Sequence, residues 1–104
     1  MNSKNKGKVG ELEWAHYLTH EGFPAHRGQQ FKGTEDSPDV ECPSLPTYHF
    51  EVKRVQRLDL HGAVVQAISD AGTRTPVVAH RRNQGQWLVT MLASDWIKLI
   101  RESL

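Results

Sequence analysis

The chain has 104 residues, 38% of them hydrophobic, a length that predicts one domain with its own core. Its 13 basic and 12 acidic residues leave a net charge of +1, so the composition is neither strongly basic nor strongly acidic. The single cysteine excludes an internal disulfide and a cysteine-based zinc cluster, and the absence of an export signal or membrane-length apolar run leads us to expect a cytoplasmic protein.

The first expected element is a helix over residues 9–21, which contain no proline and end before Gly22. Four residues recur on one helical stripe: Glu11, Trp14, Ala15 and Leu18. The stripe should be buried, and Glu13 should lie on the opposite, exposed side. A buried carboxylate needs an ion pair or a metal ion. Alternatively, Glu11 lies near the helix start, where the dipole favours negative charge without any site.

A β-hairpin is expected next. Residues 40–42 and 48–55 are rich in β-branched and aromatic types, and prolines 43 and 46 break the chain between them. If the loop is symmetric about Leu45, facing residues have numbers that sum to ninety, so Asp39 faces Glu51. Cross-strand neighbours of this kind have Cβ atoms roughly 5 Å apart.

The hairpin should have one apolar and one polar face. Alternate residues of a strand share a face, so Lys53 joins Asp39 and Glu51, while Val40 and Phe50 point the other way. Two adjacent carboxylates repel each other unless a cation lies between them, and Mg²⁺ accepts such oxygen ligands together with phosphate. The simpler interpretation is a solvated strand face with an ordinary Glu–Lys pair.

Three short motifs carry a resemblance to a known family. Residues 6–11 (KGKVGE), 37–39 (SPD) and 50–53 (FEVK) follow one another in the order found in the PD-(D/E)XK nuclease superfamily. Within it, the chain resembles the small Holliday junction resolvases of archaeal type and their phage and bacterial relatives. The resemblance implies one restriction-endonuclease-like α/β nuclease domain over residues 1–104. It has a mixed central sheet flanked by helices, in the order αβββαβ followed by a further strand and a C-terminal helix.

The resemblance also implies site residues. Asp39, Glu51 and the backbone carbonyl of Val52 would bind Mg²⁺, or Mn²⁺ as a substitute, and Glu11 would be a further ligand or a supporting carboxylate. Lys53 would be the catalytic lysine. The expected activity is hydrolysis of DNA phosphodiester bonds by a metal-activated water.

The expected substrate is branched DNA cut during recombination by a homodimer in a bacterial or phage-infected cell. A duplex-nicking endonuclease is the alternative, and a catalytically inactive nucleic-acid-binding protein of the same fold is the alternative from another class. A purely structural role ranks last. The chain has no glycine-rich phosphate loop followed by Lys-Ser or Lys-Thr, so we expect no nucleotide cofactor.

Basic and amide residues are segregated along the chain and suggest phosphate contacts around an acidic centre. The candidates for DNA contact are Lys6, Lys8, Arg27, Gln29, Gln30, Lys32, Arg54, Arg57, Arg81 and Arg82. The alternative for any one of them is an ordinary mixed-charge surface.

The second half predicts a compact α/β unit. Residues 60–71 have helical spacing, with a stripe that includes Ile68, and end at Gly72. Residues 76–80 should form a strand parallel to the Phe50 strand, and residues 87–91 the next strand. A last helix, capped by Ser94, should carry three residues inward, or present them to a second subunit: Trp96, Ile97 and Ile100.

Two further residues are candidates for accessory roles. Gln66 lies off the apolar stripe of the middle helix, and we interpret it as a surface residue that could also be functional. His49 should face Glu41 on the polar side of the hairpin. His16 and His20 are one helical turn apart, a spacing that can bind zinc, but without partner motifs we expect them to be solvent-exposed.

Overall fold

The computed structural model describes the backbone of residues 3–28 and 39–104 and the side chains of 7–28 and 39–104. The elements are α1 (Ser3–His20), β1 (His26–Arg27), β2 (Val40–Glu41), β3 (Tyr48–Arg54), α2 (Leu60–Ala71), β4 (Thr75–Arg81), β5 (Leu88–Thr90) and α3 (Ala93–Ser103). The α/β class and the element order αβββαββα are as predicted. No helix in the described part of the chain is long and apolar enough to cross a membrane.

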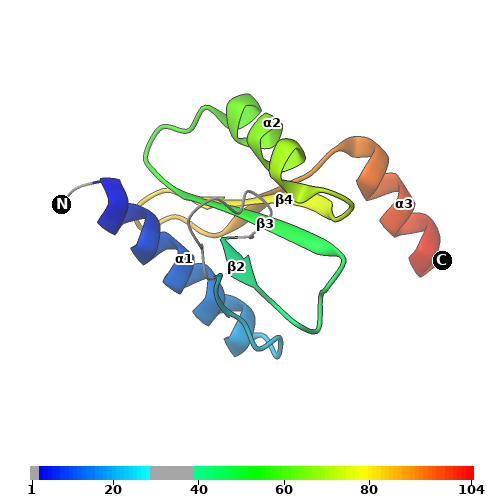
Figure 1. Cartoon of the computed structure of the whole chain (residues 1–104), viewed down its shortest axis with the longest axis horizontal. Coiled ribbons are helices and arrows are strands. Elements are labelled where there is room, and N and C mark those ends of the chain that lie inside the picture. Colours follow the sequence, from blue (N-terminus) through cyan, green and yellow to red (C-terminus); the bar gives the residue numbers. More distant parts are fainter. Residues whose placement is uncertain (1–2, 29–38) are drawn as a thin grey trace.

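The five strands form one mixed sheet in the order β1-β2-β3-β4-β5. The central pair, β3 and β4, is parallel, as predicted, and the other three pairs are antiparallel. Figure 1 shows α1 and α2 on opposite sides of this sheet, with α3 at the far end from the start of α1. The long connection through α2 is what allows two neighbouring strands to run in the same direction.

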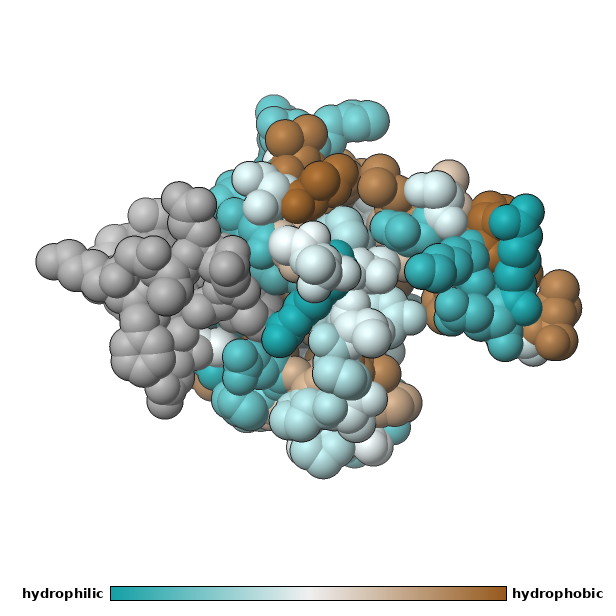
Figure 2. Space-filling model, turned by 45° about the vertical axis from the view of Figure 1, so that its right-hand side comes forward, coloured by the Kyte–Doolittle hydropathy of each residue, from teal (hydrophilic) through white to brown (hydrophobic). Residues whose placement is uncertain are grey.

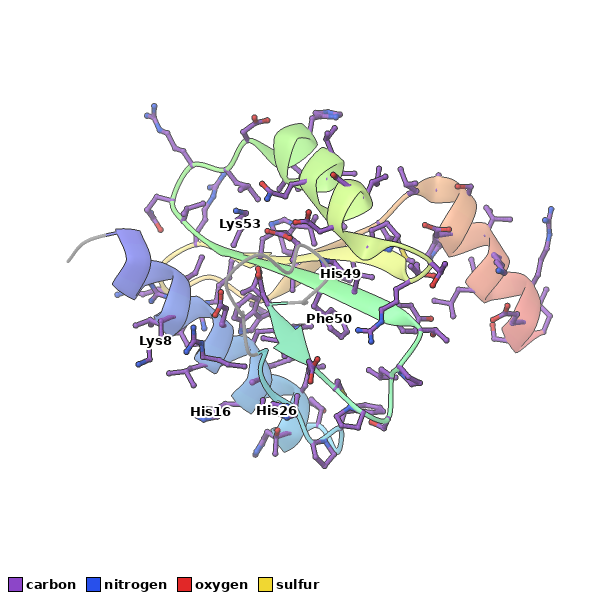
Figure 3. The ribbon with its side chains drawn as sticks, viewed as in Figure 1. Lys8, His16, His26, His49, Phe50 and Lys53 are labelled. Carbon is purple, nitrogen blue, oxygen red and sulfur yellow. The ribbon has the colours of Figure 1, made fainter. Side chains whose placement is uncertain are left out.

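Two apolar clusters fill the spaces between the sheet and its helices. The larger cluster lies between α1 and the sheet and consists of Trp14, Ala15, Leu18, Val40, Cys42, Phe50, Val52, Val77 and Ala79. The smaller cluster lies under α2 and consists of Ala63, Ala67 and Val78. Because side chains alternate along β3, Phe50 and Val52 face α1, and His49, Glu51 and Lys53 take the face toward α2. Figure 3 labels three of these strand residues.

The predicted register of the hairpin is confirmed, because Val40 pairs with Phe50. Asp39 precedes β2, and its backbone N–H holds it against β3 through a bond of 3.2 Å to the carbonyl of Phe50. A slip of β2 by one residue would have turned Val40 out of the α1 core and the polar residues beside it inward.

Three predictions about helices were wrong in part. The first helix begins at Ser3, not at residue 9, so the lysine-rich segment before the apolar stripe is helical. On α2, Ile68 is exposed, because the small alanines of this helix make the close contact with the sheet. Helix α3 begins at Ala93, its N-cap is Leu92 without a side-chain bond, and Trp96 and Ile97 are exposed.

Gly10 allows α1 to cross close to β3. A Cβ atom built on Gly10 would lie 2.9 Å from the Cβ of Arg54, a distance that real Cβ contacts do not reach. We therefore expect Gly10→Ala to push α1 away from β3 and to lower the free energy of unfolding by about 1 to 3 kcal/mol in a urea titration.

Gly7 offers a matched control on the same helix. Nothing lies within 4 Å of a Cβ at this position, so Gly7→Ala should raise stability by about 0.5 to 1 kcal/mol through helix propensity. Equal effects of the two substitutions would contradict the close crossing at Gly10.

Candidate metal and phosphate site

The predicted site residues line one hollow beside the first half of α1 and the carboxyl end of β3. Its volume is about 300 Å³. It is lined by Gly7, Glu11, Asp39, Glu51, Val52, Lys53, Arg54 and Val55. All four side chains predicted to be catalytic are in this set, although they come from three separate segments of the chain. The carboxyl ends of strands in α/β sheets are where ligands commonly bind.

Backbone hydrogen bonds fix Asp39 at the start of β2. Its N–H donates to the carbonyl of Phe50, and its own carbonyl accepts a bond of 2.9 Å from the N–H of Gly28. Its side-chain Oδ2 accepts a bond of 2.9 Å from the N–H of Val52. In a strand, the N–H and C=O of one residue point to the same edge, so the carbonyl of Val52 also faces Asp39 beyond the end of β2.

The hollow is electrostatically negative at Asp39. Burial and the nearby carboxylate of Glu51 raise the pKa of Asp39 from 3.8 to about 7, and Glu11 adds to the rise. The hydrogen bond from Val52 and the charge of Lys53 act in the opposite direction without cancelling it. A group with these surroundings releases its proton most readily when a further positive charge is present.

Glu51 and Lys53 form the other side of the site. Glu51 is buried, and its Oε2 lies 3.7 Å from Nζ of Lys53. The side chain of Lys53 is 36% exposed, so its ammonium group is accessible to a ligand that enters the hollow. The predicted proximity of Asp39, Glu51 and Lys53 on one face is therefore present in the structure.

Glu11 has a partner that the sequence did not predict. Its Oε1 accepts a hydrogen bond of 2.8 Å from Nε of Arg27, and its side chain is only 14% exposed. The two-residue strand β1 carries Arg27 to α1 and so neutralises the buried carboxylate. Glu11, Asp39 and Glu51 do not all lie within 4.8 Å of one another, so Glu11 is better placed to support the site than to share a ligand shell with both other carboxylates.

Glu13 was predicted to be exposed, and this was wrong. It is half-buried, and its Oε1 lies 2.6 Å from Nε of Arg54 and 3.9 Å from an Nη of Arg81. Arg81 also lies over the ring of Trp87, 5.6 Å from the ring centroid. Long guanidinium side chains from the ends of β3 and β4 reach the flank of α1, which a helical-wheel argument does not anticipate.

The predicted DNA contacts fall into three groups. Arg27, Arg54 and Arg81 take part in ion pairs within the protein. Others have exposed side chains that are available to a ligand: Lys8, Arg57 and Arg82. The remaining candidates lie outside the described residues: Gln29, Gln30, Lys32 and the side chain of Lys6.

Each of the two accessory candidates lies close to a carboxylate, Gln66 to Asp70 and His49 to Glu51. Gln66 is exposed, as predicted, and its Nε2 lies 3.4 Å from Oδ2 of Asp70. His49 is buried beneath α2, and its Nε2 lies 3.7 Å from Oε1 of Glu51. Glu41, which the register of Val40 and Phe50 places opposite His49, is exposed, and its Oε2 lies 3.4 Å from Nε2 of His26.

Comparison with known proteins finds no relative: no family model, no curated protein and no solved structure matches this chain. The function is therefore inferred from the residues and from their geometry.

Proposed function

We propose that the protein is a metal-dependent DNA endonuclease of the PD-(D/E)XK type, acting on branched DNA as a junction-resolvase-like enzyme. The observation that carries the proposal is the convergence of Glu11, Asp39, Glu51 and Lys53 on one hollow. Three carboxylates and an amine that line one hollow suit a phosphodiester substrate and a divalent cation better than a neutral ligand. Such an enzyme would work in the cytoplasm, where DNA is present.

The donor atoms fit Mg²⁺. Asp39, Glu51 and the carbonyl of Val52 would hold the ion, a set of hard oxygen ligands that leaves room for water and phosphate oxygens. The raised pKa of Asp39 supports this assignment, because a cation beside the carboxylates would offset the repulsion that raises it. When bound, Mg²⁺ or Mn²⁺ would neutralise phosphate charge and lower the pKa of the attacking water.

The chain's own residues would do the rest. Lys53 would hold the nucleophilic water or balance the charge that develops on the phosphate oxygens. Glu51, whose Oε2 lies 3.7 Å from Nζ of Lys53, would help to hold that ammonium group at the hollow. The ion pair of Glu11 with Arg27 would hold α1 against β1 and so keep the wall of the hollow in place.

The direct test uses the purified chain with three labelled substrates: a four-way junction, a linear duplex and a single strand. Each is incubated with Mg²⁺ or with EDTA. Cleavage of the junction that needs Mg²⁺ would support the proposal, and cleavage of the duplex alone would favour the nicking enzyme. Binding without cleavage of any substrate in Mg²⁺ or Mn²⁺ would overturn the proposed activity in favour of an inactive DNA-binding protein.

Two exposed arginines should contribute to DNA affinity through phosphate contacts. A plot of log affinity against log salt concentration has a negative slope. We expect Arg57→Ala and Arg82→Ala each to make this slope less steep by about one, because each removes about one phosphate contact. The slope is measured by fluorescence anisotropy of a labelled junction at several salt concentrations, with Ca²⁺ present in place of Mg²⁺.

Arg101→Ala is the matched control for these arginines. Arg101 is exposed on α3, at the far end of the sheet from the start of α1 (Figure 1). If all three variants reduce the salt dependence of binding equally, DNA does not bind preferentially along the hollow.

We further propose that the active form is a homodimer that pairs through α3 and the edge strand β5. Both elements expose large apolar side chains: Leu88, Val89, Leu92, Trp96, Ile97 and Leu99. Figure 2 shows apolar side chains among polar ones around α3. Sedimentation velocity should give a particle of twice the chain mass, and Trp96→Glu should convert it to a monomer. A wild-type monomer at all accessible concentrations would contradict this arrangement.

A further inference from the structure

A second group of ligand-type side chains lies beneath α2. His49 and Glu51 are two residues apart on β3 and therefore share one face, and Asp70 reaches them from the last turn of α2. One ligand atom from each residue lies within 4.8 Å of the other two. Among the described residues, no other group of three His, Cys, Asp or Glu side chains meets this spacing.

His49 has no hydrogen bond to the part of the chain that the structure describes. The residue is 1% exposed, and both Nδ1 and Nε2 lack a partner. Buried polar atoms are almost always satisfied, so an unpartnered imidazole calls for a ligand. Its Nε2 lies 3.7 Å from Oε1 of Glu51, too far for a hydrogen bond.

The spacing of these atoms suits a shared metal ion. Two ligands bonded at about 2.1 Å to one tetrahedral ion lie about 3.4 Å apart, close to the observed separation of Nε2 and Oε1. One imidazole and two carboxylates provide three protein ligands and leave a fourth position for water. A nitrogen ligand favours Zn²⁺ and similar transition metals over Mg²⁺.

The position of Asp70 is a separate indication that a cation belongs here. The last turn of α2 contains no basic residue, and the negative end of a helix dipole disfavours an aspartate there. Asp70, the dipole of α2 and Glu51 together place negative charge around His49. Gln66 donates to Asp70 over 3.4 Å from the exposed side of α2, so the site is close to solvent.

We propose that His49, Glu51 and Asp70 form a binding site for a transition metal ion of the Zn²⁺ type, separate from the Mg²⁺ position between Asp39 and Glu51. The two positions would share Glu51, whose Oε1 faces His49 while its Oε2 faces Lys53. Occupation of the new site would therefore hold Glu51 in a fixed orientation at the edge of the hollow. The site depends on His49 and Asp70 and stands whether or not the protein cuts DNA.

The test measures Zn²⁺ binding by isothermal titration calorimetry and Co²⁺ binding by visible absorption, with the full chain free of any polyhistidine tag. We expect one ion per chain and an absorption band typical of low-coordinate Co²⁺. Asp70→Asn should weaken Zn²⁺ binding at least about tenfold, since a ligand matters at least as much as the groups that orient it. His49→Gln should do the same.

Two control variants separate this site from its competitors. His16→Gln removes half of the exposed histidine pair on α1, and Asp39→Asn removes a ligand of the Mg²⁺ position. Neither should change Zn²⁺ affinity by more than about twofold. Asp70 is partly exposed, so Asp70→Asn tests the site even if His49→Gln does not fold.

Three results would overturn the site. These are no Zn²⁺ binding by the wild-type chain, unchanged binding in Asp70→Asn, or loss of binding in His16→Gln. Loss in Asp39→Asn with unchanged binding in Asp70→Asn would assign the ion to the hollow. None of these results depends on nuclease activity, so the site and the proposed function can fail independently.

Discussion

Asp39→Asn should abolish DNA cleavage and at the same time make the metal-free protein more stable at neutral pH. The two effects have one cause. Burial, Glu51 and Glu11 raise the pKa of Asp39 to about 7, so the charged carboxylate is unfavourable in the folded protein without a cation. Asparagine keeps an oxygen that can accept the bond from the N–H of Val52, but it cannot carry the negative charge.

The sign of the pH effect follows from the direction of the shift. Between pH 4 and pH 7 the unfolded chain releases the Asp39 proton and the folded chain keeps it, so the free energy of unfolding falls as pH rises. Above pH 7, Asp39 is ionised in both the folded and the unfolded state, and its buried charge then lowers the free energy of unfolding by the full amount. A rise in the pKa of Asp39 from 3.8 to about 7 corresponds to roughly 4 kcal/mol as an upper bound, and we expect Asp39→Asn to recover about 2 to 4 kcal/mol at pH 8.

Urea titrations of wild type and Asp39→Asn in EDTA at pH 4 and pH 8 measure this difference. Glu41→Gln is the control, because Glu41 is an exposed carboxylate on the same hairpin. At pH 8, the free energy of unfolding should be higher for Asp39→Asn than for wild type. Glu41→Gln should not differ from wild type. A destabilised Asp39→Asn at pH 8, or one that still cuts DNA, would show that Asp39 is not a metal ligand whose buried charge destabilises the metal-free protein.

Lys53→Ala should lower the rate of DNA cleavage roughly 100- to 1,000-fold, since it removes a charge placed beside the reacting phosphate. DNA binding should change little, because a single half-exposed lysine is a small part of the phosphate contacts. The measurement is single-turnover cleavage of a labelled junction in Mg²⁺, together with binding of the same junction in Ca²⁺.

Two further variants sharpen this prediction. Lys98→Ala removes an exposed lysine on α3 and should leave cleavage unchanged. Lys53→Arg keeps the charge but replaces a compact ammonium with a planar guanidinium, so we expect it to restore little activity. If Lys53→Ala cuts DNA at the wild-type rate, Lys53 has no role in catalysis.

The hairpin and its register could be predicted because local patterns specify them. Alternating apolar residues decide which face of β3 is buried, and the prolines on either side of Leu45 confine the turn. Asp39, Glu51 and Lys53 then share a face by strand geometry alone. The parallel pairing of β3 and β4 follows from the helix between them.

The partners of the buried charges could not be predicted in the same way. Arg27 reaches Glu11 through a two-residue strand that has no sequence signature, and Arg54 reaches Glu13 across the end of the sheet. Both contacts join segments that are far apart in the chain, so helix periodicity, which placed Glu11 on the buried stripe and Glu13 on the exposed side, could identify neither arginine partner. The apolar stripe of α3 predicted burial, but the structure leaves Trp96 52% exposed.

The cluster under α2 has a partial signature in the sequence. His49 was expected on the polar face of the hairpin, and that face is covered by α2. An aspartate in the last turn of a helix, with no basic residue beside it, indicates a nearby positive group. Combining Asp70 with the position of His49 would have suggested a buried polar site between α2 and β3.

Anomalous diffraction from crystals grown with Mn²⁺ would locate the cation that we propose for the hollow. We predict a peak within coordination distance, about 2.2 Å, of a carboxylate oxygen of Asp39, one of Glu51 and the carbonyl oxygen of Val52, and no such peak in Asp39→Asn crystals. A fully occupied Mn²⁺ site elsewhere, with none between Asp39 and Glu51, would contradict the claim that these carboxylates hold a catalytic cation beside Lys53.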